Sequence, residues 1–311
     1  MRISLGANQY GKAENRVVRI YRDTDRHEIC DLNVSTALRG EFGAAHTAGD
    51  QADVLPTDTQ KNTAFAYAKE NGVTSPEDYA IALGTHFLDA APKADSAQIR
   101  VEKYAWDRIP VGGSGHDHAF VRRGGAVRST VVTVSGRGSD QQVWVVSGLQ
   151  DLVLLKSTGS EFKGFLTDPY TTLQETEDRI LATSLAAHWR YEGAGPDWNG
   201  VDWNSVDWNG AYDNIQASLL ETFATTYSRA LQETLYLMGE QVLKTHQDVA
   251  EIKFSAPNRH HFLVDLAPFG LENNGEVFVA ADRPYGLIEA ALARDDASDA
   301  GEAWLALRSF L

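Results

Sequence analysis

The sequence has only one cysteine and no long hydrophobic run, and these features argue against a disulfide-bonded protein and a membrane-spanning one. A lone cysteine, Cys30, cannot form a disulfide within the chain, which is typical of a reducing compartment. No stretch approaches the roughly 20 consecutive apolar residues of a membrane-spanning helix. The first residues, MRISLGANQYGK, lack the apolar core of a signal peptide. We therefore expect a cytoplasmic protein that binds no membrane, with Cys30 buried as a packing residue.

Basic residues are scarce relative to acidic ones. The 311 residues include 28 Lys and Arg against 43 Asp and Glu, which gives a formal net charge of -15. A surface of this sign repels nucleic acid, and no cluster of basic residues offsets it. Hydrophobic residues make up 43% of the chain, enough apolar material for two cores. The composition predicts an ordered globular protein that binds no nucleic acid.

Sequence motifs for common cofactors are also missing. No Gly-rich phosphate loop follows a predicted strand, so nothing indicates a flavin or a nicotinamide. His116 and His118 could share one face of a strand as metal ligands do, but no Cys, Asp or Glu motif accompanies them. The triplet Asp-Trp-Asn repeats every five residues over 197–209, without EF-hand spacing. We interpret it as a surface connector with one Trp docked at the following helix, and we predict no metal and no cofactor.

The first half of the chain predicts the order strand, strand, helix, helix, strand, strand. Apolar and polar residues alternate where strands are expected, and two helix starts carry capping signals, a capping box at Thr57 and a Ser75-Pro76 pair. The predicted elements are a hairpin over 16–36, a helix from Thr57 to about 72, a helix from 76, and strands over 98–108 and 119–134 separated by a Gly-rich turn at 112–115.

The second half predicts the same order of elements, with little residue identity to the first. Two strands are followed by a long helical region that breaks near Tyr227-Ser228, and two further strands close the series. The predicted elements are strands over 142–156 and 179–191, helices within 206–246, a strand over 250–266 interrupted around Pro257, and a strand over 275–291. The repeated order predicts two similar α+β domains in tandem.

A run in the middle of the chain resembles the signature of the urate oxidase (uricase) family. The run is LVLLKSTGSEFKGFLTDPYTTLQETEDR, residues 152–179, with Phe162 and Arg179 at the spacing of the family. Four more segments match in order: Tyr10-Gly11-Lys12, Thr57-Asp58 within TDTQKNT, Leu231-Gln232, and Pro257-Asn258-Arg259-His260. Together they cover most of the chain. The end, Arg308 to Leu311, differs from the Ser-Lys-Leu peroxisomal address of many eukaryotic members, which predicts a bacterial-type protein.

The resemblance implies a fold and an assembly. The fold is a pair of tunnelling-fold domains, each ββααββ with helices on one face of an antiparallel sheet, which form a tunnel-shaped barrel on assembly. We expect the first domain over residues 1–139, the second over 140–297 and a tail over 298–311. Family members are homotetramers with each active site between two subunits, so Lys12, Thr57 and Asp58 of one chain are expected to face the remaining site residues of another.

The resemblance also implies a reaction, the cofactor-free conversion of urate, dioxygen and water to 5-hydroxyisourate and hydrogen peroxide. Substrate contacts are expected from Thr57, Asp58 through its main-chain N–H, Phe162, Arg179, Leu231, Gln232 and Asn258. Catalysis is expected from a proton relay of Lys12, Thr57 and His260. Phe162 offers an aromatic face to a purine, while Arg179 and Gln232 offer planar hydrogen-bond groups to its edges.

Two alternatives stay open from the sequence. Tunnelling folds also serve pterin enzymes, which need a glutamate to anchor the pterin and often zinc ligands. A urate or purine sensor would keep the binding residues without catalysis, although the joint presence of Lys12, Thr57 and His260 argues against it. Release of peroxide separates an oxidase from both.

Overall fold

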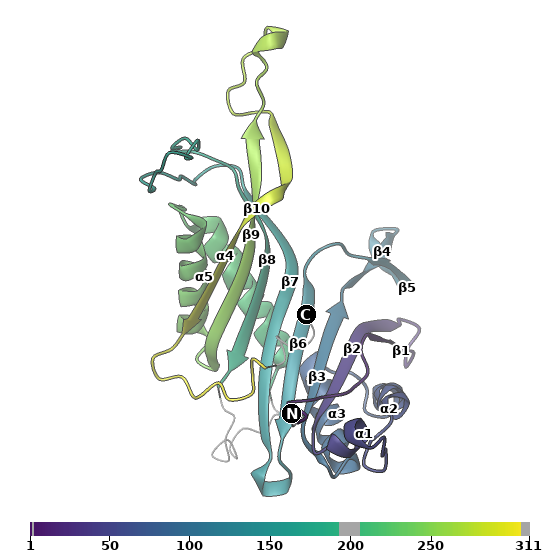
Figure 1. The fold of residues 1–311 in the computed structure, drawn as a ribbon. Coiled ribbons are helices and arrows are strands. Elements are labelled where there is room, and N and C mark those ends of the chain that lie inside the picture. The colour runs from purple at the N-terminus through teal and green to yellow at the C-terminus, as the bar shows by residue number, and fades with distance from the viewer. Residues whose placement is uncertain (2, 193–205, 306–311) are drawn as a thin grey trace. The chain divides into compact units, whose positions relative to one another are not determined.

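The computed structural model describes residues 1, 3–192 and 206–305 (Figure 1). Two compact units divide the chain. Unit 1 comprises Met1–Gly148, Arg190–Ala211 and Asp296–Leu311, and unit 2 comprises Leu149–Trp189 and Tyr212–Asp295. Strand β7 (Gln142–Lys156) contributes its first residues to unit 1 and the others to unit 2. The two units therefore share strand β7.

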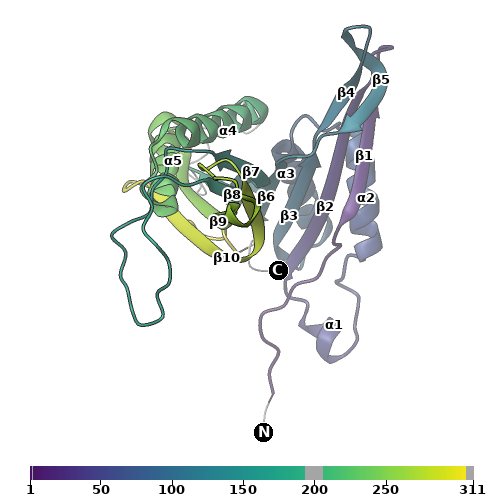
Figure 2. The ribbon, with the colours of Figure 1, turned by 90° about the horizontal axis from the view of Figure 1, so that it is seen from above.

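Unit 1 is a sheet covered on one face by helices. Its elements are β1 (Asn15–Tyr21), β2 (Glu28–Gly40), α1 (Gly43–Thr47), α2 (Thr57–Glu70), α3 (Pro76–Ala90), β3 (Ala94–Tyr104), β4 (Trp106–Val111), β5 (Ser114–Arg122), β6 (Val127–Ser135) and the 3₁₀ turn η1 (Gly138–Asp140). The sheet order is β1-β2-β3-β6-β7, and the pairs β1-β2, β2-β3 and β3-β6 are antiparallel. Figure 2 shows α2 and α3 along one face of these strands. The predicted hairpin and both predicted helices are confirmed.

The helix starts of unit 1 confirm one capping prediction and correct the other. Ser75 is the N-cap of α3, and its hydroxyl accepts a hydrogen bond from the Asp78 N–H, as predicted. The capping box at Thr57 is wrong, because Pro56 is the N-cap of α2 and Thr57 is already the first helical residue. Gln60 does not reach back to the helix start as a box requires; its side chain bonds to Thr36 and to the Leu55 carbonyl.

Two predicted strands of unit 1 are each divided in the structure. The ladder of β2 and β3 ends at the pair of Asp31 with Tyr104, after which β4 pairs with β5 in a separate two-stranded sheet. The predicted strands over 98–108 and 119–134 therefore become four. The period of two continues through both parts, so the pattern could not reveal where the chain leaves the main sheet.

Unit 2 repeats the arrangement of unit 1. Its elements are the second part of β7, β8 (Leu181–Tyr191), α4 (Trp208–Thr225), α5 (Leu231–Thr245), β9 (Val249–Leu263), the 3₁₀ turn η4 (Ala267–Phe269) and β10 (Phe278–Ala293), with sheet order β7-β8-β9-β10. The α4 and α5 helices cover one face of these strands (Figure 1). The predicted break between the two helices is confirmed. The predicted interruption of β9 is wrong, because Pro257 lies within the strand opposite Leu287.

Strand β9 can include Pro257 because the ladder between β9 and β10 is irregular nearby. The register between β9 and β10 shifts between the pairs Ala281 with His260 and Gly286 with Asn258. Bulges of this kind accommodate residues that cannot donate to the ladder, and proline has no N–H to donate. The same bulge lies beside two predicted site residues, Asn258 and His260.

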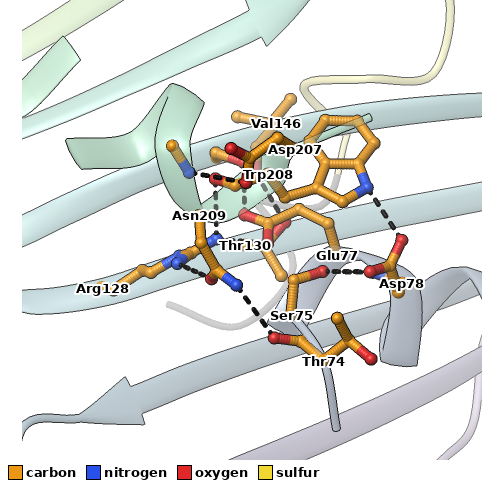
Figure 3. Close-up of polar contacts among 12 residues, drawn as sticks. Thr74, Ser75, Glu77, Asp78, Arg128, Thr130, Val146, Asp207, Trp208 and Asn209 are labelled. Atoms are coloured by element: carbon orange, nitrogen blue, oxygen red, sulfur yellow. Dashed lines mark hydrogen bonds and ion pairs between the residues drawn. The ribbon is translucent and has the colours of Figure 1, made fainter. Parts of the chain in front are cut away.

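The third Asp-Trp-Asn triplet, at the start of α4, belongs to unit 1 and is docked within it, as Figure 3 shows. The Trp208 side chain is 2% exposed, and its indole N–H donates to the Asp78 carboxylate at 2.9 Å. The Asn209 amide donates to the Thr74 carbonyl at 3.0 Å and accepts from the Arg128 guanidinium at 2.7 Å. The prediction of one docked Trp is therefore confirmed, whereas the first two triplets lie outside the described residues.

The predicted fold class is confirmed. Each unit has the predicted order ββααββ, with the β4-β5 hairpin and the short α1 added to unit 1. Cys30 is buried at 5% exposure, as expected of a packing residue. Across the described residues, no helix is long and apolar enough to cross a bilayer.

Candidate active site

Unit 2 contains a cavity of about 660 Å³ near one end of its sheet. A volume of this order is typical of sites for small molecules. Six predicted substrate-contact or catalytic residues line it: Phe162, Arg179, Leu231, Gln232, Asn258 and His260. They come from three places along the chain, namely the segment between β7 and β8, the start of α5 and the middle of β9.

Phe162 lies in the segment between β7 and β8, which folds back on itself. The main-chain groups of Phe162 and Thr176 bond to each other in both directions, at 2.9 and 3.1 Å. The ring of Phe162 stacks on that of Phe165 with centroids 5.1 Å apart and planes inclined by 13°. Phe162 is half-buried and lines the cavity, so the segment places an aromatic side chain where a flat ligand can contact it.

Arg179 is fixed beside that ring. Its main-chain N–H donates to the Ser160 carbonyl at 2.9 Å, and its Nε donates to the Ser160 hydroxyl at 3.3 Å. The guanidinium carbon lies 5.2 Å from the centre of the Phe162 ring. Desolvation lowers the pKa of Arg179, yet an arginine keeps its charge in proteins. Because the Ser160 hydroxyl accepts the hydrogen bond from Nε, the two Nη groups can donate together to an anion.

Main-chain and side-chain hydrogen bonds join the Arg179 segment to the start of α5. The Thr234 hydroxyl donates to the Ser228 hydroxyl at 2.7 Å, and the main chain of Ser228 pairs with that of Ser160 in an isolated β-bridge; all three side chains are fully buried. The sequence analysis did not single out these three residues, since short polar side chains carry no motif. Their effect is to hold the arginine and the helix start at a fixed separation.

The start of α5 presents Leu231 and Gln232 to the cavity. Leu231 is the first residue of the helix and is buried, whereas Gln232 is exposed. The N-cap residue, Ala230, supplies no side-chain cap, and the first amides of a helix have no partner within it. The helix start therefore adds partial positive charge and free N–H donors beside the amide of Gln232.

Strand β9 contributes Asn258 and His260, which lie two residues apart and so on the same face. The ring of His260 stacks on that of Phe262 with centroids 5.8 Å apart. His261 also lines the cavity, and its Nδ1 lies 3.2 Å from the Arg259 carbonyl oxygen. The sequence analysis had not assigned His261 to the site.

The three other predicted site residues lie in unit 1. Lys12 follows Gly11 on a segment bonded to β2, and Thr57 and Asp58 form the first turn of α2. The Asp58 carboxylate is exposed and accepts hydrogen bonds from Lys61 and Asn62. Its pKa lies below the ordinary value, chiefly because of Lys61, with a smaller attraction from Lys12. The Thr36 hydroxyl accepts from the Lys12 N–H and donates to Gln60, so the Lys12 segment lies near the first turn of α2.

The histidines that suggested a metal site are on the β4-β5 hairpin. The rings of His116 and His118 have centroids 4.5 Å apart, and the ring of His27 lies 6.0 Å from that of His118. Within the part of the chain that the structure describes, no three His, Cys, Asp or Glu side chains are grouped so as to hold a metal ion.

The residues that line the cavity of unit 2 include groups that suit a flat, polar, anionic ring. An aromatic face, an arginine fork, two side-chain amides and a helix N-terminus are the groups that such a ligand requires on its plane and edges. Binding at such a site requires hydrogen bonds as well as a complementary shape, because each buried polar group must find a partner on the ligand.

Comparison with known proteins gives the family. The family model described as Uricase matches residues 8–133 and 145–289. The uricase of Arthrobacter globiformis is 49% identical over 309 residues, which cover 99% of this chain and 96% of the relative. The uricase of Aspergillus flavus is 35% identical over 301 residues, covering 94% and 97%.

Solved structures agree with the sequence comparisons. The crystal structure of uricase from Arthrobacter globiformis matches with a TM-score of 0.88 at 49% identity, covering 98% of this chain and all of that one. A uricase from Bacillus fastidious matches with a TM-score of 0.79 at 25% identity, covering 93% and 94%. The chain therefore belongs to the uricase family, which confirms the resemblance found in the sequence. It is an enzyme, an oxidoreductase that acts on urate.

Proposed function

We propose that the chain oxidises urate with dioxygen and water to 5-hydroxyisourate and hydrogen peroxide, without a metal or an organic cofactor. The cavity of unit 2 carries the proposal, because its groups fit a flat purine anion. The chemistry needs no resident redox group when the substrate itself supplies electrons. Triplet dioxygen reacts slowly with closed-shell molecules, but a deprotonated urate is electron-rich enough to give up one electron.

Four side chains bind the substrate. Phe162 stacks on the purine plane, and Arg179 donates two parallel bonds to a carbonyl oxygen and a ring nitrogen. Gln232 donates and accepts on the opposite edge, and Leu231 fills apolar space beside it. The fixed position of Arg179 on Ser160 supports this assignment, because a fork that is already oriented loses less entropy on binding.

Three residues move protons. Lys12 acts as the base, and Thr57 relays a proton between Lys12 and the substrate or water, with His260 completing the relay. The main-chain N–H of Asp58, at the first turn of α2, binds an oxygen of the anionic ring. Asn258, together with Thr57, holds dioxygen and later water above the ring plane.

The reaction passes through a C5 hydroperoxide. One-electron transfer from the urate anion to dioxygen and recombination form the C–O bond at C5. Loss of hydrogen peroxide then leaves an electrophilic C5, to which water adds to give 5-hydroxyisourate. The protein contributes proton transfer, orientation and exclusion of bulk water.

The two groups of site residues meet between subunits in a homotetramer. Lys12, Thr57 and Asp58 belong to unit 1, whereas the other site residues belong to unit 2. In this arrangement the first group of one subunit closes the cavity of another. The boundary between domains at residues 139 and 140 and a cytoplasmic location are further predictions that accompany this proposal.

The test is to add urate to metal-free protein in air, follow the loss of its ultraviolet absorbance, and assay peroxide. We expect about one peroxide per urate, unchanged by chelators, because the electrons come from the substrate. Turnover that disappears with chelation and returns with one added metal would contradict the cofactor-free reaction. Tight urate binding without peroxide would instead identify a sensor.

A further inference from the structure

The main chain at Lys12 is held by Thr36 of β2. The Thr36 N–H donates to the Lys12 carbonyl at 2.8 Å, and the Lys12 N–H donates to the Thr36 hydroxyl at 3.2 Å. Gly11 permits this close approach, because a Cβ at that position would lie 1.7 Å from the Thr36 carbonyl oxygen. The segment of Lys12 is thus bonded to one residue of β2 through both the main chain and a side chain.

The Thr36 hydroxyl continues the connection to α2. It donates to Oε1 of Gln60 at 2.6 Å, and the Thr36 and Gln60 side chains are 3% and 0% exposed. Gln60 is the fourth residue of the helix whose first residue is Thr57. One hydroxyl therefore accepts from the Lys12 segment and donates to the first turn of the helix that carries Thr57.

The connection closes into a ring through Leu55 and Tyr10. Nε2 of Gln60 donates to the Leu55 carbonyl at 3.3 Å, and the Leu55 N–H donates to the Tyr10 hydroxyl at 3.0 Å. Tyr10 precedes Lys12 by two residues and is itself fixed, with its ring 4.8 Å from that of Phe42 and its main chain bonded to Leu38 in both directions. The hydrogen bonds return to the segment where they began.

We propose that Gln60 is a positioning residue, which sets the distance between Lys12 and the start of α2 by bonding at once to Thr36 and to Leu55. The proposal depends on the proposed proton-transfer roles of Lys12 and Thr57. A glutamine amide can donate and accept simultaneously, and this buried position uses both functions. Glutamate, which only accepts when ionised, would place a charge beside the Leu55 carbonyl, and methionine would remove both bonds.

The consequence for catalysis is kinetic. Proton transfer between Lys12 and Thr57 depends on their separation, and a displacement of about 1 Å costs on the order of 100-fold in rate. The side chains proposed to bind the purine lie in unit 2, outside the ring of hydrogen bonds, and the start of α2 adds the main-chain N–H of Asp58 to them. A change at Gln60 should therefore lower kcat and leave the affinity for the purine nearly unchanged.

The chain offers a matched control for this change. Gln98 of β3 is another glutamine with no exposed surface in unit 1, and its Nε2 donates to the Thr133 hydroxyl at 3.3 Å. It has no bond to the Lys12 segment or to α2. Gln98→Met also removes a buried side-chain amide from unit 1. It therefore reports the cost of losing a buried amide without changing the positions of Lys12 and the start of α2.

The experiment compares Gln60→Met, Gln98→Met and Lys12→Met in kcat, KM, the pH profile of kcat, and the binding of xanthine as a non-substrate purine. We expect Gln60→Met to lower kcat about 10- to 100-fold, with KM and xanthine binding changed less than about threefold and the pH profile altered. Gln98→Met should keep kcat. Thr36→Val should resemble Gln60→Met, and Thr36→Ser, which keeps the hydroxyl, should restore most of the activity.

The outcomes distinguish this proposal from the proposed function. If Lys12→Met keeps the kcat of the parent, the proposed role of Lys12 as the base is wrong, and the positioning role of Gln60 is overturned as well. If Lys12→Met loses activity while Gln60→Met and Thr36→Val keep it, only the positioning role is overturned. An equal loss in Gln98→Met would mean that any buried amide matters. Where Gln60→Met does not fold, the Thr36 pair tests the same ring.

Discussion

The proposed site residues of the two units are expected to affect different kinetic constants. Lys12→Met and Thr57→Ala should lower kcat by about 100-fold or more while xanthine still binds, because these groups act on protons in the transition state. Arg179→Ala should mainly raise KM and weaken xanthine binding, by about 10- to 100-fold, since it removes a charged pair of hydrogen bonds. Steady-state kinetics and a xanthine titration measure both effects.

Equal loss of binding in the three variants would refute this division of roles. Arg179→Lys is a useful companion, because it keeps the charge but loses the fork and the bond from Nε to Ser160. Recovery of binding in Arg179→Lys would show that charge alone matters, contrary to the proposed bidentate contact.

At this scale the sequence predicted residues that line the cavity of unit 2 but not the contacts that hold them. Phe162 and Arg179 stand in a recognisable run of residues, so the motif found them. Gln60 was noticed for the wrong reason, as half of a capping box, and its bond to Thr36 spans 24 residues. Ser160, Ser228 and Thr234 carry no pattern, because their bonds depend on how a loop packs against a helix. Such contacts follow from tertiary structure alone.

The helices of the two units share a packing detail that supports their duplication. Helices α3 and α5 each have 15 residues, and in each the ninth is a glycine, Gly84 and Gly239, which faces the sheet. A Cβ at Gly84 would lie 2.7 Å from Cγ2 of Val134, and one at Gly239 would lie 2.9 Å from Cδ1 of Leu292. In both places the helix approaches the strands closely.

Gly84→Ala should destabilise the protein even though alanine favours helix. Val134 is a stiff β-branched residue with no exposed surface, so overpacking costs about 1–3 kcal/mol, against a gain of about 1 kcal/mol in helix propensity. Gly239→Ala should cost less, because the far end of the Leu292 side chain can turn away. Thermal unfolding midpoints of both variants test this, and a Gly84→Ala that is as stable as the parent would contradict the close packing.

Periodicity predicted the strands and helices well where one face of the element is buried. It failed where the chain leaves one sheet and joins another. The alternation through 98–108 is continuous, yet β3 and β4 belong to different sheets. Pro257 argued for an interruption that the neighbouring bulge makes unnecessary. Both errors concern the neighbour with which a strand pairs in the sheet. A local sequence pattern does not contain that information.

At the scale of the whole molecule, the site residues are divided between two units. Unit 1 carries Lys12 and, at the start of α2, Thr57, which are two of the three residues proposed to move protons, and unit 2 carries His260 and the cavity. A site completed by a second subunit would make activity depend on assembly, so dilution that dissociates the oligomer should abolish turnover in folded chains.

The most direct test of a site shared by two subunits is to co-express Lys12→Met and Arg179→Ala chains with different tags and isolate oligomers that contain both. Assayed at urate far below the KM of Arg179→Ala, each parental variant should have low activity, Lys12→Met through its kcat and Arg179→Ala through its KM. If Lys12 of one chain serves the cavity of another, random mixing leaves about a quarter of the sites with both groups intact, and the mixed oligomers regain activity accordingly. If the mixed oligomers remain as inactive as their parents, the two groups do not form one site across a subunit boundary.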